Sequence, residues 1–418
     1  MMKNVAVIGF GNVGAGVIEL LWQGKIAGLA LKKVVVKHLE KPRPFELPSA
    51  MFTTEVNAVI SDPDIQVIVE LVGNAEVAAK IIFDALKNGK EVVTANKSVI
   101  AEKGDLIFTE AAMLGRFIGF RATFVGCHSL IHELNEARLS ASRIKRISAI
   151  LNGTSNYILS TMSKEAKSFD EALHEAQEHG YAEQDPSQDI DGIDTAYKLR
   201  ILLGLINDTR RASGDFPIEG IRGITLQDIQ YADELGYRIK LIGAIEQPDK
   251  LTFVRVHPVL IAPDSLLGSV EGNNNAIEIE DDLGVTSGWV APGAGKYPAS
   301  LAIIKDLIDI AQERKPLFPR GNNIIPLGDI GELQTRYYLR FSVVDQAGVL
   351  AQICNIFWQY NVSLATVTQK KGESRNFVPV VMTTHPVKEK DLRQSVGKID
   401  QLEIIKAATK VVRIYEKD

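Results

Sequence analysis

A glycine-rich turn near the N-terminus constrains the fold more than any other feature of the sequence. The pattern G-x-G-x-x-G is met by Gly9-Phe10-Gly11-Asn12-Val13-Gly14, between a β-branched run at 3–8 and a helical pattern at 13–22. Here the first glycine permits a tight turn, the second lets the backbone approach a pyrophosphate, and the third allows close helix–strand packing. The helix N-terminus supplies amide donors to the anion. The turn therefore predicts a dinucleotide site; the alternative is a glycine turn without a ligand.

Strands and helices alternate over the residues that follow this turn. Strand patterns at 31–36, 66–72 and 91–94 are joined by helical patterns, one of which runs from Ala75 to Lys87. Such alternation is typical of a parallel, doubly wound sheet of the Rossmann type. We expect an NAD(P)-binding domain over 1–125, completed by a helix at 299–315.

The remaining chain follows a different order of elements. Residues 126–298 mix strands and helices and are predicted to form an α+β catalytic and dimerisation domain. Residues 316–334 contain several Pro, Gly and Asn without periodicity, which predicts an irregular linker. Residues 335–418 read strand, helix, strand, strand, helix, strand, the order of a ferredoxin-like module. Placed after such a linker, this module is expected to be separable from the rest.

Charge, hydropathy and cysteine usage exclude several classes of function. The net charge of −5 and the pI near 5.9 leave no basic stripe for a phosphate backbone, so nucleic acid is not an expected partner. No apolar run reaches the length of a membrane span, so no membrane partner is expected. The two cysteines, Cys127 and Cys354, have no metal or redox spacing. These features favour a reduced, cytoplasmic protein.

Two positions at predicted strand ends bear on the cofactor. The second strand ends at Val36-Lys37-His38, without the acidic residue that would bind the ribose of NAD. Lys37 or Arg43 could meet a 2′-phosphate instead, so NADP is favoured over NAD. Lys97 follows the strand at 91–94, where ligands bind in doubly wound sheets. The alternative for Lys97 is a solvated loop lysine.

A dense acidic segment lies in the middle of the chain. It reads Glu183-Gln184-Asp185-Pro186 and then Asp189-Ile190-Asp191-Gly192-Ile193-Asp194, with Lys198 four residues further on. Asp194 and Lys198 share one helix face, where a lysine beside carboxylates can move a proton. The spacing equally fits turns, an exposed ion pair or a site for a hard cation. Just upstream, Thr154 or Ser155 is expected either to cap a helix or to face a substrate.

These motifs together resemble homoserine dehydrogenase. The resemblance runs through roughly the first 315 residues. Besides the motifs above, it rests on 150–159, 180–186 and Gly293-Ala294-Gly295. The tail from 336 looks like an ACT domain, with Asp345-Gln346-Ala347-Gly348-Val349-Leu350 at its first strand-to-helix turn. The resemblance implies reversible oxidation of L-homoserine to L-aspartate 4-semialdehyde, within threonine, methionine and isoleucine biosynthesis. It further implies an amino-acid effector at the tail, with threonine as the expected one, and a homodimer or homotetramer.

The resemblance also assigns roles to individual residues. Lys198 would be the proton donor and acceptor at the substrate oxygen, with Asp194 beside it and Lys97 at the junction of cofactor and substrate. The substrate would be held by Glu183, Asp189 and Asp194. The cofactor would be held by the glycine turn, Lys97 and Gly295. Charge that develops on the aldehyde oxygen during hydride transfer would be stabilised by a nearby ammonium.

The segment 121–129 departs from the family pattern. The family has Glu-Ala-x-Val-x-x-Gly-x-Pro, and its carbonyls often bind sodium, which here would use Phe124, Gly126 and His128. This chain reads Arg121-Ala122-Thr123-Phe124-Val125-Gly126-Cys127-His128-Ser129. Arg121 brings positive charge next to the site, so we expect little or no dependence on monovalent cations. Two alternatives remain open: a related dehydrogenase with an altered substrate, and a catalytically impaired amino-acid sensor.

Overall fold

The computed structural model describes residues 2–124, 143–212, 214–248, 251–293, 295–314, 319, 321–369 and 377–415. These residues form two compact units, each built from three stretches of the chain. The first unit comprises 1–147, 194–215 and 273–326, and the second comprises 148–193, 216–272 and 327–418. No helix among the described residues is both long enough and apolar enough to cross a membrane.

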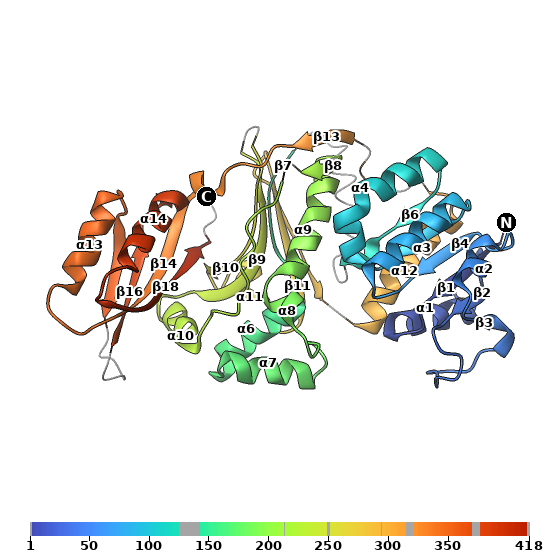
Figure 1. Ribbon diagram of the computed structural model, residues 1–418, viewed down its shortest axis with the longest axis horizontal. Coiled ribbons are helices and arrows are strands. Elements are labelled where there is room, and N and C mark those ends of the chain that lie inside the picture. Colours follow the sequence, from blue (N-terminus) through green and yellow to red (C-terminus); the bar gives the residue numbers. More distant parts are fainter. Residues whose placement is uncertain are drawn as a thin grey trace. The chain divides into compact units, whose positions relative to one another are not determined.

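A six-stranded parallel sheet forms the centre of the first unit (Figure 1). Its order is β3-β2-β1-β4-β5-β6. The strands are β1 (Lys3–Ile8), β2 (Leu29–Val35), β3 (Phe52–Thr53), β4 (Val67–Glu70), β5 (Glu91–Thr94) and β6 (Ile118–Gly119). This is the dinucleotide-binding strand order, with the switch point at β1 and β4, and it confirms the doubly wound α/β expectation.

Helices flank this sheet and bury its apolar strands. They are α1 (Asn12–Trp22), α2 (Val56–Ser61), α3 (Ala75–Lys87), α4 (Lys97–Leu114) and α12 (Lys296–Ala311). Helix α1 joins β1 to β2 and α3 joins β4 to β5, and these two crossovers run in opposite directions along the sheet. Because parallel crossovers are right-handed, α1 and α3 cover opposite faces. Helix α12 packs on α1 and shares its core, so a helix from late in the sequence completes this unit. It begins three residues before the expected 299 because Gly295 caps it.

The rest of the first unit comes from the middle of the chain. It contains η2 (Arg121–Phe124), α9 (Ile193–Ile206), β8 (Thr209–Ala212), β11 (Asn274–Asp281), β12 (Thr286–Pro292) and β13 (Gly321–Ile325). Strand β13 pairs in parallel with β8. Residues 321–325, within the stretch expected to be an irregular linker, therefore form a strand. The Pro, Gly and Asn residues of this stretch concealed a strand that is defined by a partner more than 100 positions earlier in the chain.

The second unit combines a helical part with a mixed, mostly antiparallel sheet. Strand β7 (Ile144–Ile150) leads into it, and its other elements up to residue 269 are α6 (Gly153–Glu165), α7 (Phe169–Glu178), α8 (Ser187–Ile190), α10 (Leu226–Glu234), β9 (Arg238–Glu246), β10 (Phe253–Ile261) and α11 (Leu266–Ser269). Strands β9 and β10 pair over nine residues each. Every residue of β10 is buried, including the polar residues Arg255 and His257.

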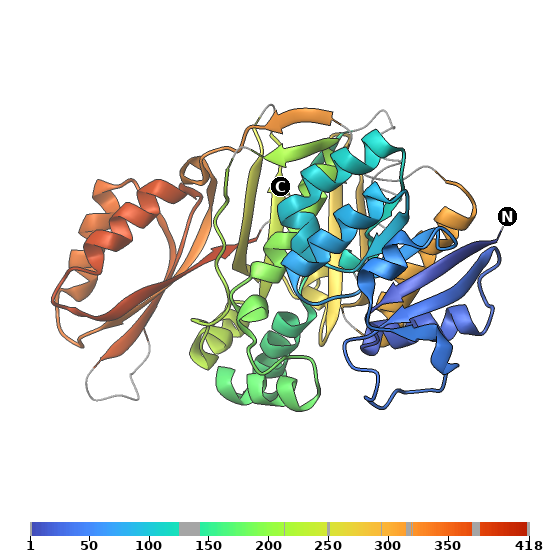
Figure 2. The ribbon, with the colours of Figure 1, turned by 45° about the vertical axis from the view of Figure 1, so that its right-hand side comes forward.

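The C-terminal residues of this unit have the expected ferredoxin-like order. After η3 (Ile330–Glu332) come β14 (Gln334–Val343), α13 (Val349–Gln359), β15 (Leu364–Gln369), β16 (Val378–Thr384), β17 (Val387–Lys388), α14 (Glu389–Ile399) and β18 (Ile405–Ile414). Figure 2 shows both helices on one face of the sheet β18-β14-β16-β15. Tyr337, Phe341 and Phe357 fill the core between them. We call residues 334–414 the C-terminal module.

The C-terminal module is joined to the rest of its unit more tightly than a separable tail would be. Strand β18 continues the sheet by pairing in parallel with β10, Arg413 opposite Val259. Asp228 of α10, which is fully buried, accepts hydrogen bonds from Arg340 at 2.7 and 3.0 Å. Removing the module would take away the counter-charge of this carboxylate and leave β10 as an open sheet edge. These contacts argue against a clean separation of the tail, and its separability stays a prediction.

Candidate active site

The glycine turn has the geometry that a dinucleotide requires. Gly9 adopts φ +114°, and a Cβ there would lie 2.8 Å from the carbonyl oxygen of Leu71. A Cβ on Gly14 would lie 2.2 Å from the Gly9 carbonyl oxygen, so helix and strand touch at this point. Gly11, the N-cap of α1, has no atom within 4 Å of the position of its missing Cβ and no side-chain cap. The cradle is open where a pyrophosphate would approach, and the residues fit the group.

Gly11→Val is expected to abolish cofactor binding without unfolding the protein. Gly11 has an extended backbone, with φ −83° and ψ −164°, and nothing obstructs a larger side chain. Valine would fill the space the pyrophosphate needs. Titration of NADPH by fluorescence measures the loss, and thermal unfolding of the apoprotein tests the fold. Retention of wild-type NADPH affinity would show that the turn does not hold the cofactor.

The neighbours of the turn extend this surface. The Phe10 ring packs against Phe45 and Phe52, at centroid distances of 5.4 and 6.1 Å. The Arg43 guanidinium lies 5.6 Å from the centre of the Phe10 ring and donates a hydrogen bond to the carbonyl oxygen of His38. Arg43 is thus fixed at the end of β2, beside the turn. The exposed residues Lys37 and His38 complete this edge, where Glu40 Oε1 lies 3.4 Å from His38 Nδ1.

The glycine turn and Gly295 each lie at the start of a helix, the turn at α1 and Gly295 at α12. Gly295 is the N-cap of this helix, with φ +138°. Ser300, in its first turns, donates a hydrogen bond to the carbonyl oxygen of Val13 at 3.1 Å. Asn12 is the exposed first residue of α1. The N-terminal regions of α1 and α12 are therefore side by side.

A hydrogen-bonded chain at the ends of β4 and β5 positions the start of α4. The Thr94 hydroxyl donates to the buried carboxylate of Glu70 at 2.6 Å, and the Asn96 amide nitrogen donates to Thr94 at 3.0 Å. The Asn96 side chain caps α4, whose first residue is Lys97. Burial raises the pKa of Glu70. Glu70 was missed from the sequence because a single acid inside an apolar strand carries no spacing signal.

Lys97, Asp194 and Lys198 meet in the first unit. Asp194 and Lys198 lie one turn apart on α9, with Lys198 Nζ 2.9 Å from Asp194 Oδ2. The other oxygen of Asp194 pairs with Lys97 Nζ. The side chain of Asp194 is 2% exposed, that of Lys198 8% and that of Lys97 36%. One buried carboxylate thus binds two ammonium groups. The sequence spacing predicted its contact with Lys198 but not its contact with Lys97.

The acidic segment before α9 lies in the second unit, anchored by residues 152–155. Asn152 donates to Asp189 Oδ1 at 2.7 Å, and Ser155 donates to the Asp189 carbonyl oxygen at 2.8 Å. Thr154 donates to the Tyr181 carbonyl oxygen at 2.6 Å. The cap of α6 is Asn152, so neither Thr154 nor Ser155 is the capping residue.

Glu183, by contrast, is exposed. Its backbone carbonyl oxygen accepts a hydrogen bond from Gln177 Nε2 at 3.1 Å. Glu183 and Asp189 belong to the second unit, whereas Lys97, Asp194 and Lys198 belong to the first. The chain runs directly from one group into the other at Gly192-Ile193-Asp194.

The sodium expectation falls largely outside the described residues. Phe124 is described and buried, whereas Gly126 and His128 are not described. Arg121, whose charge motivated the expected lack of cation dependence, is itself buried and bonds Asp306 and Asp309 of α12, each at 2.6 Å. Its charge is neutralised inside the first unit, so that argument against sodium no longer holds. Among the described residues, no cluster of three or more His, Cys, Asp or Glu side chains could hold a metal.

Comparison with known proteins gives a consistent result. Residues 9–120 match the homoserine dehydrogenase NAD-binding domain, and residues 130–308 match the homoserine dehydrogenase domain. Homoserine dehydrogenase of Synechocystis is 38% identical, with 99% of this chain and all of that one covered. The crystal structure of a homoserine dehydrogenase from Thiobacillus denitrificans superposes with a TM-score of 0.88 at 33% identity, covering 100% of this chain and 99% of that one. A hyperthermophilic archaeal homoserine dehydrogenase in complex with NADPH matches with a TM-score of 0.64 at 26% identity, over 76% of this chain and 100% of that one. The chain therefore belongs to the homoserine dehydrogenase family.

Proposed function

We propose that this dehydrogenase interconverts L-homoserine and L-aspartate 4-semialdehyde, in threonine, methionine and isoleucine biosynthesis. The observation that carries the proposal is the group Lys97–Asp194–Lys198, in the same unit as the glycine turn. The nicotinamide, when bound, accepts a hydride from the carbon that bears the substrate hydroxyl. Oxidation also releases the hydroxyl proton, so the protein needs a group that can accept it.

In the proposed mechanism Lys198 moves this proton. In the reducing direction its ammonium donates a proton to the nascent alkoxide as the hydride reaches the aldehyde carbon. Asp194 orients Lys198 by their 2.9 Å hydrogen bond and balances the charge of both lysines. Lys97, more exposed and placed at the carboxyl end of β5, stabilises negative charge on the same oxygen.

The acidic segment supplies the site for the substrate ammonium. Glu183 has an exposed carboxylate, as an amino-alcohol substrate requires, and Asp189 is fixed in place by Asn152 and Ser155. Both are proposed to bind the substrate, together with Asp194.

For the cofactor we propose NADP, with NAD as the weaker alternative. Arg43→Ala is expected to weaken NADPH binding about tenfold, or ~1.4 kcal/mol, and to leave NADH binding nearly unchanged. The reason is that Arg43, held against Phe10 at the end of β2, is placed to meet a 2′-phosphate. Dissociation constants for both cofactors check this, and Lys37→Ala tests the second candidate. A wild-type protein that binds NADH tenfold more tightly would contradict the proposal.

We further propose that the C-terminal module is an ACT domain that binds an amino acid, threonine first among the candidates. Its β-α-β-β-α-β order and buried core support this. The protein is proposed to be a cytoplasmic homodimer or homotetramer. We retain 1–125, 126–298 and 335–418 as its proposed functional domains, although its compact units combine these stretches.

The substrate is tested by following reduced cofactor formation spectrophotometrically. Homoserine is expected to be oxidised with NADP. Serine and threonine, whose hydroxyl is one carbon nearer the ammonium, and malate, which has no ammonium, are expected not to be. Preference for another amino alcohol would favour a related dehydrogenase. Cofactor binding without turnover of any of them would favour a sensor that has lost catalysis.

A further inference from the structure

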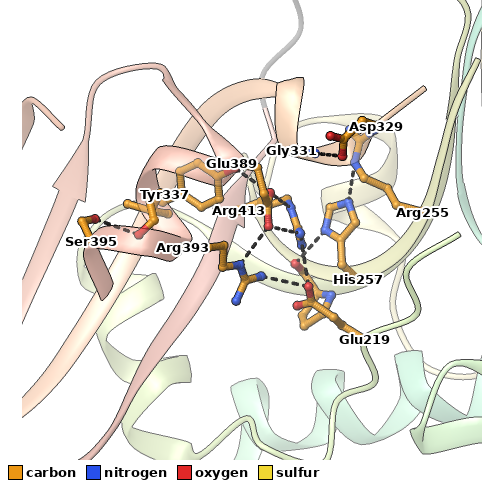
Figure 3. Close-up of polar contacts among 12 residues, drawn as sticks. Glu219, Arg255, His257, Asp329, Gly331, Tyr337, Glu389, Arg393, Ser395 and Arg413 are labelled. Carbon is orange, nitrogen blue, oxygen red and sulfur yellow. Dashed lines mark hydrogen bonds and ion pairs between the residues drawn. The ribbon is translucent and has the colours of Figure 1, made fainter. Parts of the chain in front are cut away.

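A charge network joins the C-terminal module to a short segment before α10. Figure 3 shows Glu219 facing Arg393 and Arg413, which donate to its carboxylate at 2.9 and 3.1 Å. Arg413 also donates two hydrogen bonds to Glu389, at 2.6 and 2.9 Å. Arg413 and Glu389 are each 4% exposed, so the module neutralises its own buried pair. Glu219 is the member of this network that comes from outside the module.

The backbone around Glu219 is fixed to β10. The Glu219 amide donates to the Val256 carbonyl oxygen at 2.8 Å, and the Val256 amide donates to Pro217 at 3.0 Å. His257, the next residue of β10, is fully buried. Burial and the positive charges of Arg413 and Arg255 hold its pKa well below the ordinary value, so it adds no charge to the network. Segment 217–222 thus has little freedom to drift.

The other side of this segment packs on the acidic segment without spare room. The Ile221 amide donates to the Ile190 carbonyl oxygen at 2.7 Å. A Cβ on Gly220 would lie 2.1 Å from that same oxygen. A shift of 217–222 by a fraction of an ångström is therefore passed to Ile190 and its neighbours, because packed backbones do not compress.

A second contact joins segment 217–222 to the acidic segment, this time through the side chains of Arg222 and Asp191. Arg222 donates from Nε and Nη2 to the two carboxylate oxygens of Asp191, each at 2.9 Å. This bidentate pair lowers the pKa of Asp191. Asp191 lies two residues after Asp189 and two residues before α9 begins. The segment 217–222 therefore touches the C-terminal module through Glu219 and the acidic segment through Gly220, Ile221 and Arg222.

We propose that Glu219 is a positioning residue for the substrate-binding segment 183–191, held in place by arginines of the C-terminal module. The module would set substrate affinity without touching the substrate. This inference rests on the proposed function, in which Glu183 and Asp189 bind the homoserine ammonium. It also gives the module a role in the unliganded enzyme, independent of any effector.

The test is Glu219→Gln in the full-length protein. Glutamine keeps the shape of the side chain and an acceptor oxygen but removes the charge. Arg413 remains paired with Glu389, so the fold should survive. The KM for homoserine is expected to rise about three- to thirtyfold, the range for mutations along a coupled network. Both kcat and the NADPH dissociation constant should stay close to wild type. Hydrogen exchange measured by mass spectrometry should quicken in peptides covering 187–193.

A matched control lies in η3, just before the C-terminal module. Glu332→Gln likewise removes one carboxylate charge, here one that pairs with Lys388 and Lys390 of the module, and should leave KM and exchange unchanged. Unchanged KM and exchange in Glu219→Gln would overturn the inference. Equal losses of kcat, cofactor affinity and thermal stability would also overturn it, since they indicate general damage. If the wild-type protein fails to oxidise homoserine, the proposed function is wrong. Hydrogen exchange in Glu219→Gln still tests whether Glu219 positions the segment 183–191.

Discussion

Lys198→Ala is expected to lower kcat for homoserine oxidation by about 10²–10⁴, the usual effect of losing a general acid or base. The Lys198 side chain is 8% exposed and hydrogen-bonded to Asp194, so solvent cannot readily replace it. The NADPH dissociation constant should barely change, because the glycine turn lies on other elements. Steady-state kinetics and cofactor titration on the same preparation measure both quantities.

Glu183→Ala is the matched comparison for this variant. Its exposed carboxylate is proposed to hold the substrate ammonium, so its loss should raise KM and leave kcat largely intact. A Lys198→Ala enzyme with near-normal kcat would contradict the assignment. Lys97, which shares the carboxylate of Asp194, would then be the next candidate for proton transfer.

Arg121→Met is expected to destabilise the protein by about 3–5 kcal/mol, the cost of breaking a buried ion pair from one side. Asp306 and Asp309 of α12 would remain buried without the guanidinium that now bonds both at 2.6 Å. Denaturant unfolding measures the loss. Arg314→Ala is the control, because Arg314 also pairs with Asp309 but has a side chain 59% exposed, where pairs contribute about 0–1 kcal/mol.

The loss in Arg121→Met should depend on pH. Burial raises the pKa of Asp306 to about 6, above its ordinary value, and removing Arg121 would raise it further. A carboxyl group whose pKa is raised by folding destabilises the fold above that pKa and ceases to do so as pH falls towards the unfolded value. The deficit should therefore shrink between neutral and mildly acidic pH. A deficit that is small at neutral pH, or one that grows on acidification, would contradict this account.

Local pattern predicted much of the fold. The glycine turn, the alternation after it and the capped helix Ala75–Lys87 all have short-range causes, and α3 has those same bounds. The β-α-β-β-α-β order of the C-terminal module was also legible, because each element is short and clearly periodic. The i, i+4 pair Asp194–Lys198 followed from helix geometry alone.

Features that depend on distant partners were not predictable. Strand β13 exists because β8 pairs with it, and its own sequence reads as a loop. Arg121 looked like a charge beside a cation site because its partners, Asp306 and Asp309, lie some 185 residues away. The second lysine on Asp194 required the start of α4 to meet α9. In each case the deciding contact is tertiary, and a single sequence contains no trace of it.

The measurement that tests the central claim most directly is transfer of deuterium from homoserine labelled at the hydroxyl-bearing carbon. We predict that the purified protein moves the label to the nicotinamide of NADP, with semialdehyde formed in equal amount, and that Lys198→Ala slows this transfer at unchanged cofactor affinity. Mass spectrometry of the reduced cofactor gives the result. Reduced cofactor without the label, or no reduction by wild type at saturating homoserine, would contradict the assignment of homoserine oxidation to this centre.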